Sequence, residues 1–141
     1  MPKPCVVVDT SVLVSAFLTL GPAQELLDLA QQGAFILCLS DRILVETTRS
    51  LQKPRLMAAY RHDAQSVVEF TTALASIALV ATEVGAIDPA CRDPDDDHVL
   101  AAALTMHANF IVTGDADLLA LGQFQGVQIL TIRTFLDQLQ S

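Results

Sequence analysis

The sequence predicts an α/β fold, a three-layer α/β/α sandwich around a central parallel sheet of four to five strands. Short apolar runs that are typical of strands alternate with segments whose apolar residues recur at helical spacing. The strand-like runs are apolar throughout rather than at every second residue, as in parallel strands buried on both faces. The chain has 141 residues, of which 52% are hydrophobic, and this suits a single domain over residues 1–141.

Five segments are the expected strands. The first places three valines before an aspartate. The third is the weakest, because alanines interrupt its β-branched residues. In chain order the five segments are residues 5–9, 35–39, 77–84, 109–113 and 127–132.

Helices are expected between and after these strands. Pro22 opens the first and Gly33 ends it, while Ser40 or Asp41 caps the second, which ends near Pro54. The remaining helices are expected at residues 62–75, 93–107 and 134–139. Strands that alternate with helices imply right-handed crossovers, which put helices on both faces of the sheet.

The composition argues against several classes of protein. No apolar stretch is long enough to span a membrane and the N-terminus is a poor signal peptide, so we expect a cytoplasmic protein without membrane contact. The three cysteines lack the spacing of zinc ligands. Cys5 and Cys38 lie in apolar runs and Cys91 lies in a loop, so buried, reduced thiols are expected.

Charge is segregated along the chain. The net charge of −8, taken alone, argues against nucleic-acid binding, which usually leaves a basic footprint. However, seven of the sixteen acidic residues lie between Asp88 and Asp117, and five of the eight basic residues lie between Arg42 and Arg61. An acidic cluster of this density is costly through self-repulsion unless a cation lies in it.

Acidic residues from four separate segments are expected at one edge of the sheet. Crossover helices run antiparallel to the strands, so strand carboxyl ends and helix amino ends share that edge, where ligands bind. Asp9 ends the first strand, and Glu46 follows the cap of the second helix, with its side chain leaning back toward the cap. The other acidic residues follow the fourth strand or begin the helix before it: Asp93, Asp95, Asp96, Asp97, Asp115 and Asp117.

Several of these residues also have a purely structural explanation. Asp93 before Pro94 is an ordinary helix cap, and acidic residues in a first helical turn suit the helix dipole. Glu46, taken alone, fits a solvated position on a helix. Asp115 or Asp117 could cap a turn or a short helix. Folding alone, however, does not require all of these acidic residues to converge on one edge of the sheet.

Asp97 and Asp9 are harder to explain by structure alone. Asp97 shares a helix face with an apolar stripe, so its carboxylate needs a partner. Asp96 has a similar but weaker claim, and spacing does not separate the two. Asp9 directly follows three valines at the end of a central strand. His98 points to a different helix face from Asp97, and both His98 and His107 are expected to be structural or surface residues rather than a general base.

Clustered carboxylates favour a hard divalent cation. Mg²⁺ prefers oxygen ligands, and a few carboxylates together with waters and substrate phosphate usually hold it. One or two such ions can activate a water, neutralise a phosphate and stabilise a leaving oxygen. The sequence contains no Ser-His-Asp triad, P-loop or GxGxxG motif. The cluster therefore predicts metal-dependent chemistry on a phosphate ester.

Four motifs in order along the chain resemble those of the PIN-domain family, in particular its VapC-like toxin branch. The segment VVVDTSVLVSAFL is similar to the first motif, an aspartate at the end of strand one followed by small polar residues. The segment LSDRILVETTRSLQKPRL resembles the second, CRDPDDDHVLAAAL the third and FIVTGDADLLAL the fourth. The resemblance runs nearly end to end, and four motifs at family-like spacing are together fairly specific.

The resemblance implies an endoribonuclease that uses Mg²⁺ or Mn²⁺ to hydrolyse RNA phosphodiester bonds. It also implies the toxin of a toxin–antitoxin pair, with a cognate antitoxin as partner and a homodimer as assembly. The implied catalytic residues are Asp9, Glu46, Asp97 and Asp115. The implied metal ligands are Asp9, Asp97, Asp115 and Asp117. The implied auxiliary residues are Asp93, Asp96, Thr10, Ser11 and Thr113. In this hypothesis Glu46 completes the metal shell or orients the attacking water.

Two positions depart from the family pattern. Ser11 stands where this branch often has Asn, although Ser can still hydrogen-bond a carboxylate or a water. His98 stands where a basic residue is common, which favours altered substrate contact over altered metal binding. The candidates for binding RNA phosphates are Arg42, Arg49, Lys53 and Arg55. An ordinary solvated helix face is the alternative explanation for these basic residues.

Three other functions fit parts of the pattern. The first is a PIN-like binding or assembly module with little nuclease activity, against which the intact acidic set argues. A receiver-like phosphotransfer domain needs an aspartate after the third strand and a lysine after the fifth, where this chain has Glu83 and Arg133. A phosphatase of the haloacid-dehalogenase type needs Asp-x-Asp at the first strand, whereas Thr10 and Ser11 follow Asp9.

Overall fold

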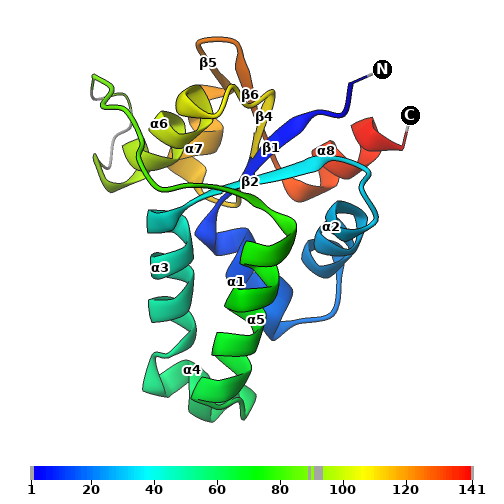
Figure 1. Ribbon diagram of the computed structural model, residues 1–141, viewed down its shortest axis with the longest axis vertical. Coiled ribbons are helices and arrows are strands. Elements are labelled where there is room, and N and C mark those ends of the chain that lie inside the picture. Colours follow the sequence, from blue (N-terminus) through cyan, green and yellow to red (C-terminus); the bar gives the residue numbers. More distant parts are fainter. Residues whose placement is uncertain (1, 89, 91–93, 141) are drawn as a thin grey trace.

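A six-stranded sheet runs through the centre of the molecule, and helices cover both of its faces (Figure 1). The computed structural model describes residues 2–88, 90 and 94–140. The strand order is β3-β2-β1-β4-β6-β5. Four neighbouring pairs are parallel, and β5 runs antiparallel to β6. The predicted α/β fold with a mostly parallel central sheet is therefore confirmed.

The strands are short, and the three-valine run lies at the centre of the sheet. Val6 of β1 lies opposite Leu37 of β2 on one side and Phe110 of β4 on the other. Because both faces of β1 are covered, Val6, Val7 and Val8 have no exposed surface. The strands are β1 Cys5–Val8, β2 Ile36–Ser40, β3 Leu79–Ala81, β4 Phe110–Val112, β5 Gln123–Phe124 and β6 Val127–Leu130.

The sheet has six strands rather than the four to five expected. The additional strand, β5, has two residues, too few to form an apolar run. It pairs with β6 through Gln125 and Gly126, whose φ angles of 48° and 89° have the positive sign that two-residue hairpin turns need. The third strand is shorter than predicted because the preceding helix continues through Ile77, and the last because Thr131 caps the next helix.

The helices match the predicted alternation, with additions. α1 is not predicted by the sequence, because it is apolar on most sides and lacks the polar face that marks an amphipathic helix. α4 is also additional, and the helix predicted at residues 93–107 is divided into a 3₁₀ turn and α6. Within the described residues the helices are α1 Thr10–Leu18, α2 Pro22–Gln31, α3 Asp41–Leu51, α4 Pro54–Tyr60, α5 Ala64–Ile77, η1 Pro94–Asp96 (the 3₁₀ turn), α6 Asp97–Thr105, α7 Ala116–Leu121 and α8 Ile132–Leu139.

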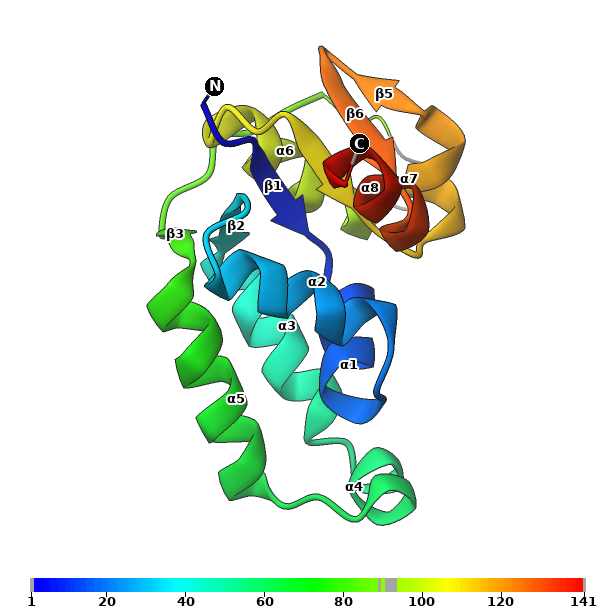
Figure 2. The same cartoon turned by 90° about the vertical axis from the view of Figure 1, so that its right-hand side faces the viewer.

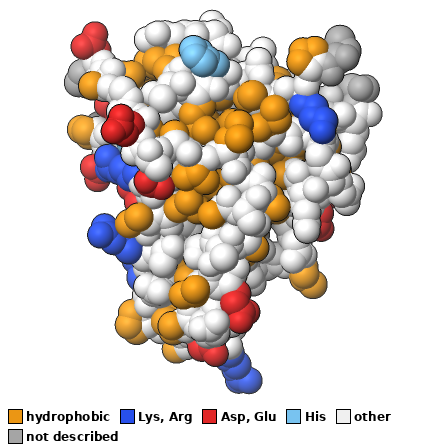
Figure 3. All heavy atoms as spheres, viewed as in Figure 1, with side chains coloured by type: hydrophobic (Ala, Val, Ile, Leu, Met, Phe, Trp, Pro, Cys, Tyr) orange, Lys and Arg blue, Asp and Glu red, His pale blue; other side chains and the backbone are white. Residues whose placement is uncertain are grey.

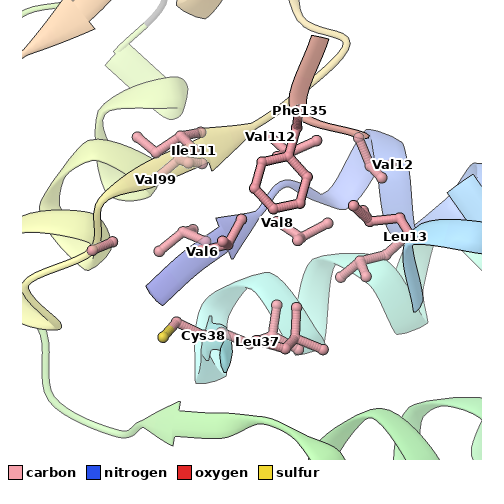
Figure 4. Close-up of a cluster of buried hydrophobic side chains, with 14 of the residues drawn as sticks. Val6, Val8, Val12, Leu13, Leu37, Cys38, Val99, Ile111, Val112 and Phe135 are labelled. Carbon is pink, nitrogen blue, oxygen red and sulfur yellow. The ribbon is translucent and has the colours of Figure 1, made fainter. Parts of the chain in front are cut away.

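The core lies between the sheet and the helices on each face. α6 contacts β1, β2 and β4 on one face, while α2 and α8 lie together on the other (Figures 1 and 2). Figure 4 shows Val6 and Val8 of β1 in one cluster with Val112 of β4 and Phe135 of α8. α3 and α5 pack together and extend past the sheet toward α4 (Figure 2). This arrangement leaves the first turn of α3 beside the carboxyl ends of the strands.

Two further expectations concern membranes and cysteines. Among the described helices, none is by itself long and apolar enough to cross a membrane; α1 and α2 reach that length and composition only as a pair bent by 101°. Cys38 is a buried free thiol, as predicted, and burial is the main cause that raises its pKa to about 11. Cys5 is a free, half-buried thiol, and Cys91 lies outside the described residues.

Candidate active site

Asp9 lies at the carboxyl end of β1, where it is the N-cap of α1. Its carboxylate is 8% exposed and accepts two short hydrogen bonds, from the backbone N–H of Thr10 to Oδ1 (2.6 Å) and from Thr113 Oγ1 to Oδ2 (2.7 Å). Burial raises the pKa of Asp9 above its ordinary value, and the Asp115 carboxylate adds to the rise, while the two hydrogen bonds oppose it. A carboxylate kept buried beside another carboxylate is a group that a bound cation would stabilise.

Thr113 ties this aspartate to the next strand of the sheet. It follows β4, is completely buried, and donates its hydroxyl to Asp9 while accepting the backbone N–H of Asp115 at 2.9 Å. Ser11 makes a parallel but longer connection, with its Oγ 3.5 Å from Asp9 Oδ2 and 3.3 Å from the backbone N of Gly114. The loop after β4 is therefore held against the end of β1 by two hydroxyl groups.

Three carboxylates beyond this loop lie close enough to share one ion. One oxygen each from Asp96, Asp115 and Asp117 lies within 4.8 Å of the others, and all three residues are half-buried. Asp115 is fixed as the N-cap of α7, since it accepts the backbone N–H of Leu118 at 2.9 Å. Oxygen ligands around Mg²⁺ are roughly 3 to 4 Å apart. The donor atoms and their spacing thus fit a hard divalent cation after a small closure of the side chains.

Glu46 lies in the second turn of α3. Its Oε1 accepts from Arg42 Nε at 3.2 Å, and its Oε2 lies 3.1 Å from His98 Nε2. Arg42 also lies within ion-pair distance of Asp95, at 3.9 Å. The pair with Arg42 is largely exposed to solvent, so it contributes little to stability and mainly sets the direction of the Glu46 carboxylate.

His98, which the sequence predicts to be a structural or surface residue, contacts one of the candidate acidic residues. Its side chain is 12% exposed, and it faces Glu46 across the gap between α6 and α3. Burial lowers the pKa of His98 and outweighs Glu46, which raises it. The sequence could not reveal this contact, because it depends on how α3 lies against α6.

Asp96 and Asp97 point to different neighbours. Successive residues of a helix are rotated by about 100° from one another, so adjacent carboxylates diverge. Asp96 joins the group with Asp115 and Asp117. Both carboxylate oxygens of Asp97 accept from the backbone N–H of Ala90, at 3.2 and 3.4 Å. The two residues that sequence spacing could not separate therefore differ in the structure by their contacts.

Comparison with known proteins identifies the family. The family described as the PIN domain matches residues 5–117. This chain belongs to the PIN-domain family. The match includes every described acidic residue named above, and the predicted resemblance is thereby confirmed. No curated protein is similar enough in sequence to match this PIN domain.

Two solved structures share the PIN fold with this chain. One is the crystal structure of VapC20 of Mycobacterium tuberculosis, described as a toxin that cleaves the sarcin–ricin loop. It is 18% identical, covers 87% of this chain and 98% of its own, and has a TM-score of 0.57. The other is the PIN domain of human SMG5, which is 16% identical, covers 96% of this chain and 98% of its own, and has a TM-score of 0.53. At these identities the likeness concerns the fold.

The other candidate residues predicted from the sequence of this PIN domain do not all lie at the site. Thr10 contributes its backbone N–H to Asp9, while its hydroxyl is buried without a hydrogen-bond partner in the described part of the chain. Asp93 lies outside the described residues. Of the basic candidates, Arg42 lies at the site, whereas three exposed residues lie farther along α3 and beyond it: Arg49, Lys53 and Arg55. Figure 3 shows acidic and basic groups alternating along this side of the molecule, rather than one basic stripe.

The two bonds of Thr113 lead to a prediction about stability. We expect Thr113→Val to cost about 1–3 kcal/mol of unfolding free energy, because the buried Asp9 carboxylate loses its shorter hydrogen bond at Oδ2 and the half-buried N–H of Asp115 loses its acceptor. The pKa of Asp9 should rise further, since the hydroxyl of Thr113 lowers it. Urea unfolding measures the first effect and an NMR titration of Asp9 the second.

Thr47→Val is the matched control. Thr47 is equally buried, but its hydroxyl donates to Ile43 O within α3, a carbonyl that helical hydrogen bonding also serves. Equal losses of stability in the two variants would show that Thr113 does not connect the two strand ends in the way described.

Proposed function

We propose that this PIN domain is an endoribonuclease that hydrolyses RNA phosphodiester bonds with the help of Mg²⁺ or Mn²⁺. The observation that carries the proposal is the group formed by Asp96, Asp115 and Asp117, which come from two separate segments and each place one oxygen within 4.8 Å of the others. Asp9 adjoins this group, since the Asp115 carboxylate contributes to the raised pKa of Asp9. Membership of a nuclease-like family supports the reaction class. The likeness in fold to a toxin described as cleaving the sarcin–ricin loop supports RNA as the proposed substrate.

Asp9, Asp115 and Asp117 are the proposed metal ligands, together with an acidic residue from the start of α6. Asp96 offers the nearer oxygen in the described arrangement, and Asp97 is the residue that the family motif implies. When bound, a divalent ion at these oxygens supplies charge neutralisation for the phosphate and acidifies a water. Thr113 and Ser11 keep Asp9 oriented, so that its carboxylate is already in place when the ion and RNA arrive.

Glu46 is the proposed residue that orients the attacking water. Arg42 and His98 each hold one of its oxygens, so the carboxylate has one direction rather than several rotamers. Each oxygen keeps a further lone pair for a water molecule. Arg42, half exposed at the rim, is the proposed first contact for an RNA phosphate.

Metal dependence and cleavage can be tested together on the purified chain. We expect a labelled RNA to be cut in Mg²⁺ or Mn²⁺, and cutting to stop when a chelator is added. Mn²⁺ at a hundred times its dissociation constant should stabilise the fold by about 2.7 kcal/mol. Binding of Mn²⁺ without cleavage of any RNA in a pool of random sequence would instead support the binding-module alternative.

The biological setting is a further part of the proposal. We propose that the protein acts in the cytoplasm as the toxin of a toxin–antitoxin pair, as a homodimer held by a cognate antitoxin. The notion of a protein partner rests on the likeness in fold to a toxin of the VapC type. Expression of the chain alone should arrest growth, and co-expression of the neighbouring gene should restore it. Normal growth without a partner would contradict the toxin role.

A further inference from the structure

A pocket of about 500 Å³ lies beside the acidic residues, between the carboxyl ends of β2 and β3 and the start of α6. We call it the side pocket, and its volume falls within the range typical of small-molecule sites. It shares Arg42, Asp97 and His98 with the candidate active site. Its lining residues include Ser40, Arg42, Ala81, Thr82, Asp97 and Ala101.

We infer that the side pocket receives one unstacked nucleobase of the RNA, next to the phosphate that is cut. This inference rests on the proposed function and adds to it a contact between the protein and one base of the RNA substrate. Proteins that recognise single-stranded RNA usually splay bases out, stack them on side chains or guanidinium planes and hydrogen-bond their edges.

The wall of the pocket is held in a defined position. Gly85 donates its backbone N–H to Thr105 Oγ1 at 3.0 Å, which ties the segment after β3 to α6. Ala90 is tied to the same helix through Asp97. The wall formed by this segment therefore lies against a rigid element at two points, as a preformed site requires.

The chemistry of the lining suits a nucleobase better than a phosphate. Two carboxylates, from Asp41 and Asp97, oppose the single guanidinium of Arg42, so a second phosphate would meet net negative charge. The remaining surface is mixed, with the apolar side chains of Val84 and Ile87 beside the hydroxyl groups of Ser40 and Thr82. An uncharged aromatic ring with polar edges matches such a lining: its faces contact the apolar walls, and its edges find both donors and acceptors.

The position of the pocket favours the same ligand. Asp97 and His98 form part of its lining, and His98 Nε2 lies 3.1 Å from Glu46 Oε2. Asp97 directly follows Asp96 of the acidic group in the chain, so we place a nucleotide next to the bound phosphate at this pocket. Arg42, fixed by Glu46, lies at that mouth with half of its side chain exposed, where a base can stack on it.

The test compares RNA substrates that lack one base with a variant that fills the pocket. With the cut site mapped, we expect a single abasic nucleotide next to it to lower kcat/KM about 10-fold or more, as losing one stacked base does elsewhere. Thr82→Trp, at an exposed lining position, should cause a similar loss on intact RNA and no further loss on the abasic RNA.

Glu83→Trp is the matched control, since Glu83 is exposed and adjacent but does not line the pocket. It should keep the full effect of the abasic nucleotide. If wild type cuts RNA but every abasic position is tolerated, or if Thr82→Trp and Glu83→Trp behave alike, the pocket does not hold a base and the proposed nuclease stands. If wild type cuts no RNA at all, the proposed function fails, and this inference fails with it.

Discussion

Replacing Asp9 by Asn is expected to lower RNA cleavage by more than about 100-fold and to make the stability of the metal-free protein less dependent on pH. The first effect follows because loss of a direct ligand should exceed the 10- to 100-fold cost typical of residues that only support one. The second follows because Asp9 is buried beside Asp115, and its ionised form is unfavourable in the fold without a cation.

The pH dependence has a definite sign. The folded pKa of Asp9 is raised above its ordinary value of 3.8, so the folded state binds this proton more tightly than the unfolded state. The corresponding stability is fully present below pH 3.8 and is lost as pH rises through the higher folded pKa. Above the folded pKa wild type has lost it. Asn has no such proton to lose, so the unfolding temperature of the variant should change less with pH than that of wild type.

The measurement combines cleavage assays with thermal unfolding, each with and without Mn²⁺. Wild type should gain stability from the metal and Asp9→Asn should gain little. Asp63→Asn is the control, because Asp63 caps α5 far from the site and Asn caps a helix equally well. Undiminished cleavage by Asp9→Asn would refute the assignment of this residue.

Replacing Asp97 by Asn is expected to lower cleavage by more than about 100-fold as well, while leaving the fold intact. The amide oxygen can still accept the backbone N–H of Ala90, so the anchoring of that segment persists. What is lost is the negative charge that the family motif implies for catalysis. The comparison variant is Asp96→Asn, one residue earlier, which should weaken Mn²⁺ binding by about 10-fold or more.

The two variants together separate the acidic residues at the start of α6. Calorimetric titration with Mn²⁺ reports on binding, and RNA cleavage reports on catalysis. Full cleavage by Asp97→Asn would restrict Asp97 to anchoring Ala90, and would assign the acid of the third motif to Asp96. Unchanged Mn²⁺ affinity in Asp96→Asn would remove Asp96 from the metal site.

Much of the fold could be predicted because the determining patterns are local. Three consecutive valines specify a strand buried on both faces, and Ser40 specifies the start of a helix through its bond to the N–H of Ile43. α1 could not be predicted in the same way, since its sequence is apolar on most sides and lacks a polar face. β5 depends on its hairpin partner rather than on its own two residues.

In the candidate site, too, the features set by local sequence could be predicted, and those set by contacts between distant segments could not. The position of Asp9 follows from the end of an obvious strand, and that of Asp115 from the end of another. The contact between His98 and Glu46 joins residues of two helices far apart in sequence, so no spacing predicts it. Likewise, the different neighbours of Asp96 and Asp97 depend on how one 3₁₀ turn leads into α6.

The shortness of the outermost strands limits how copies of this protein can meet. At one margin of the sheet β5 presents two residues, and at the other β3 presents three. Edge strands of two or three residues have few unpaired backbone N–H and C=O groups, so a strand from another molecule can hardly pair with them. Growth of the sheet into larger fibrous assemblies is thereby discouraged, and any self-association has to proceed through helical surfaces.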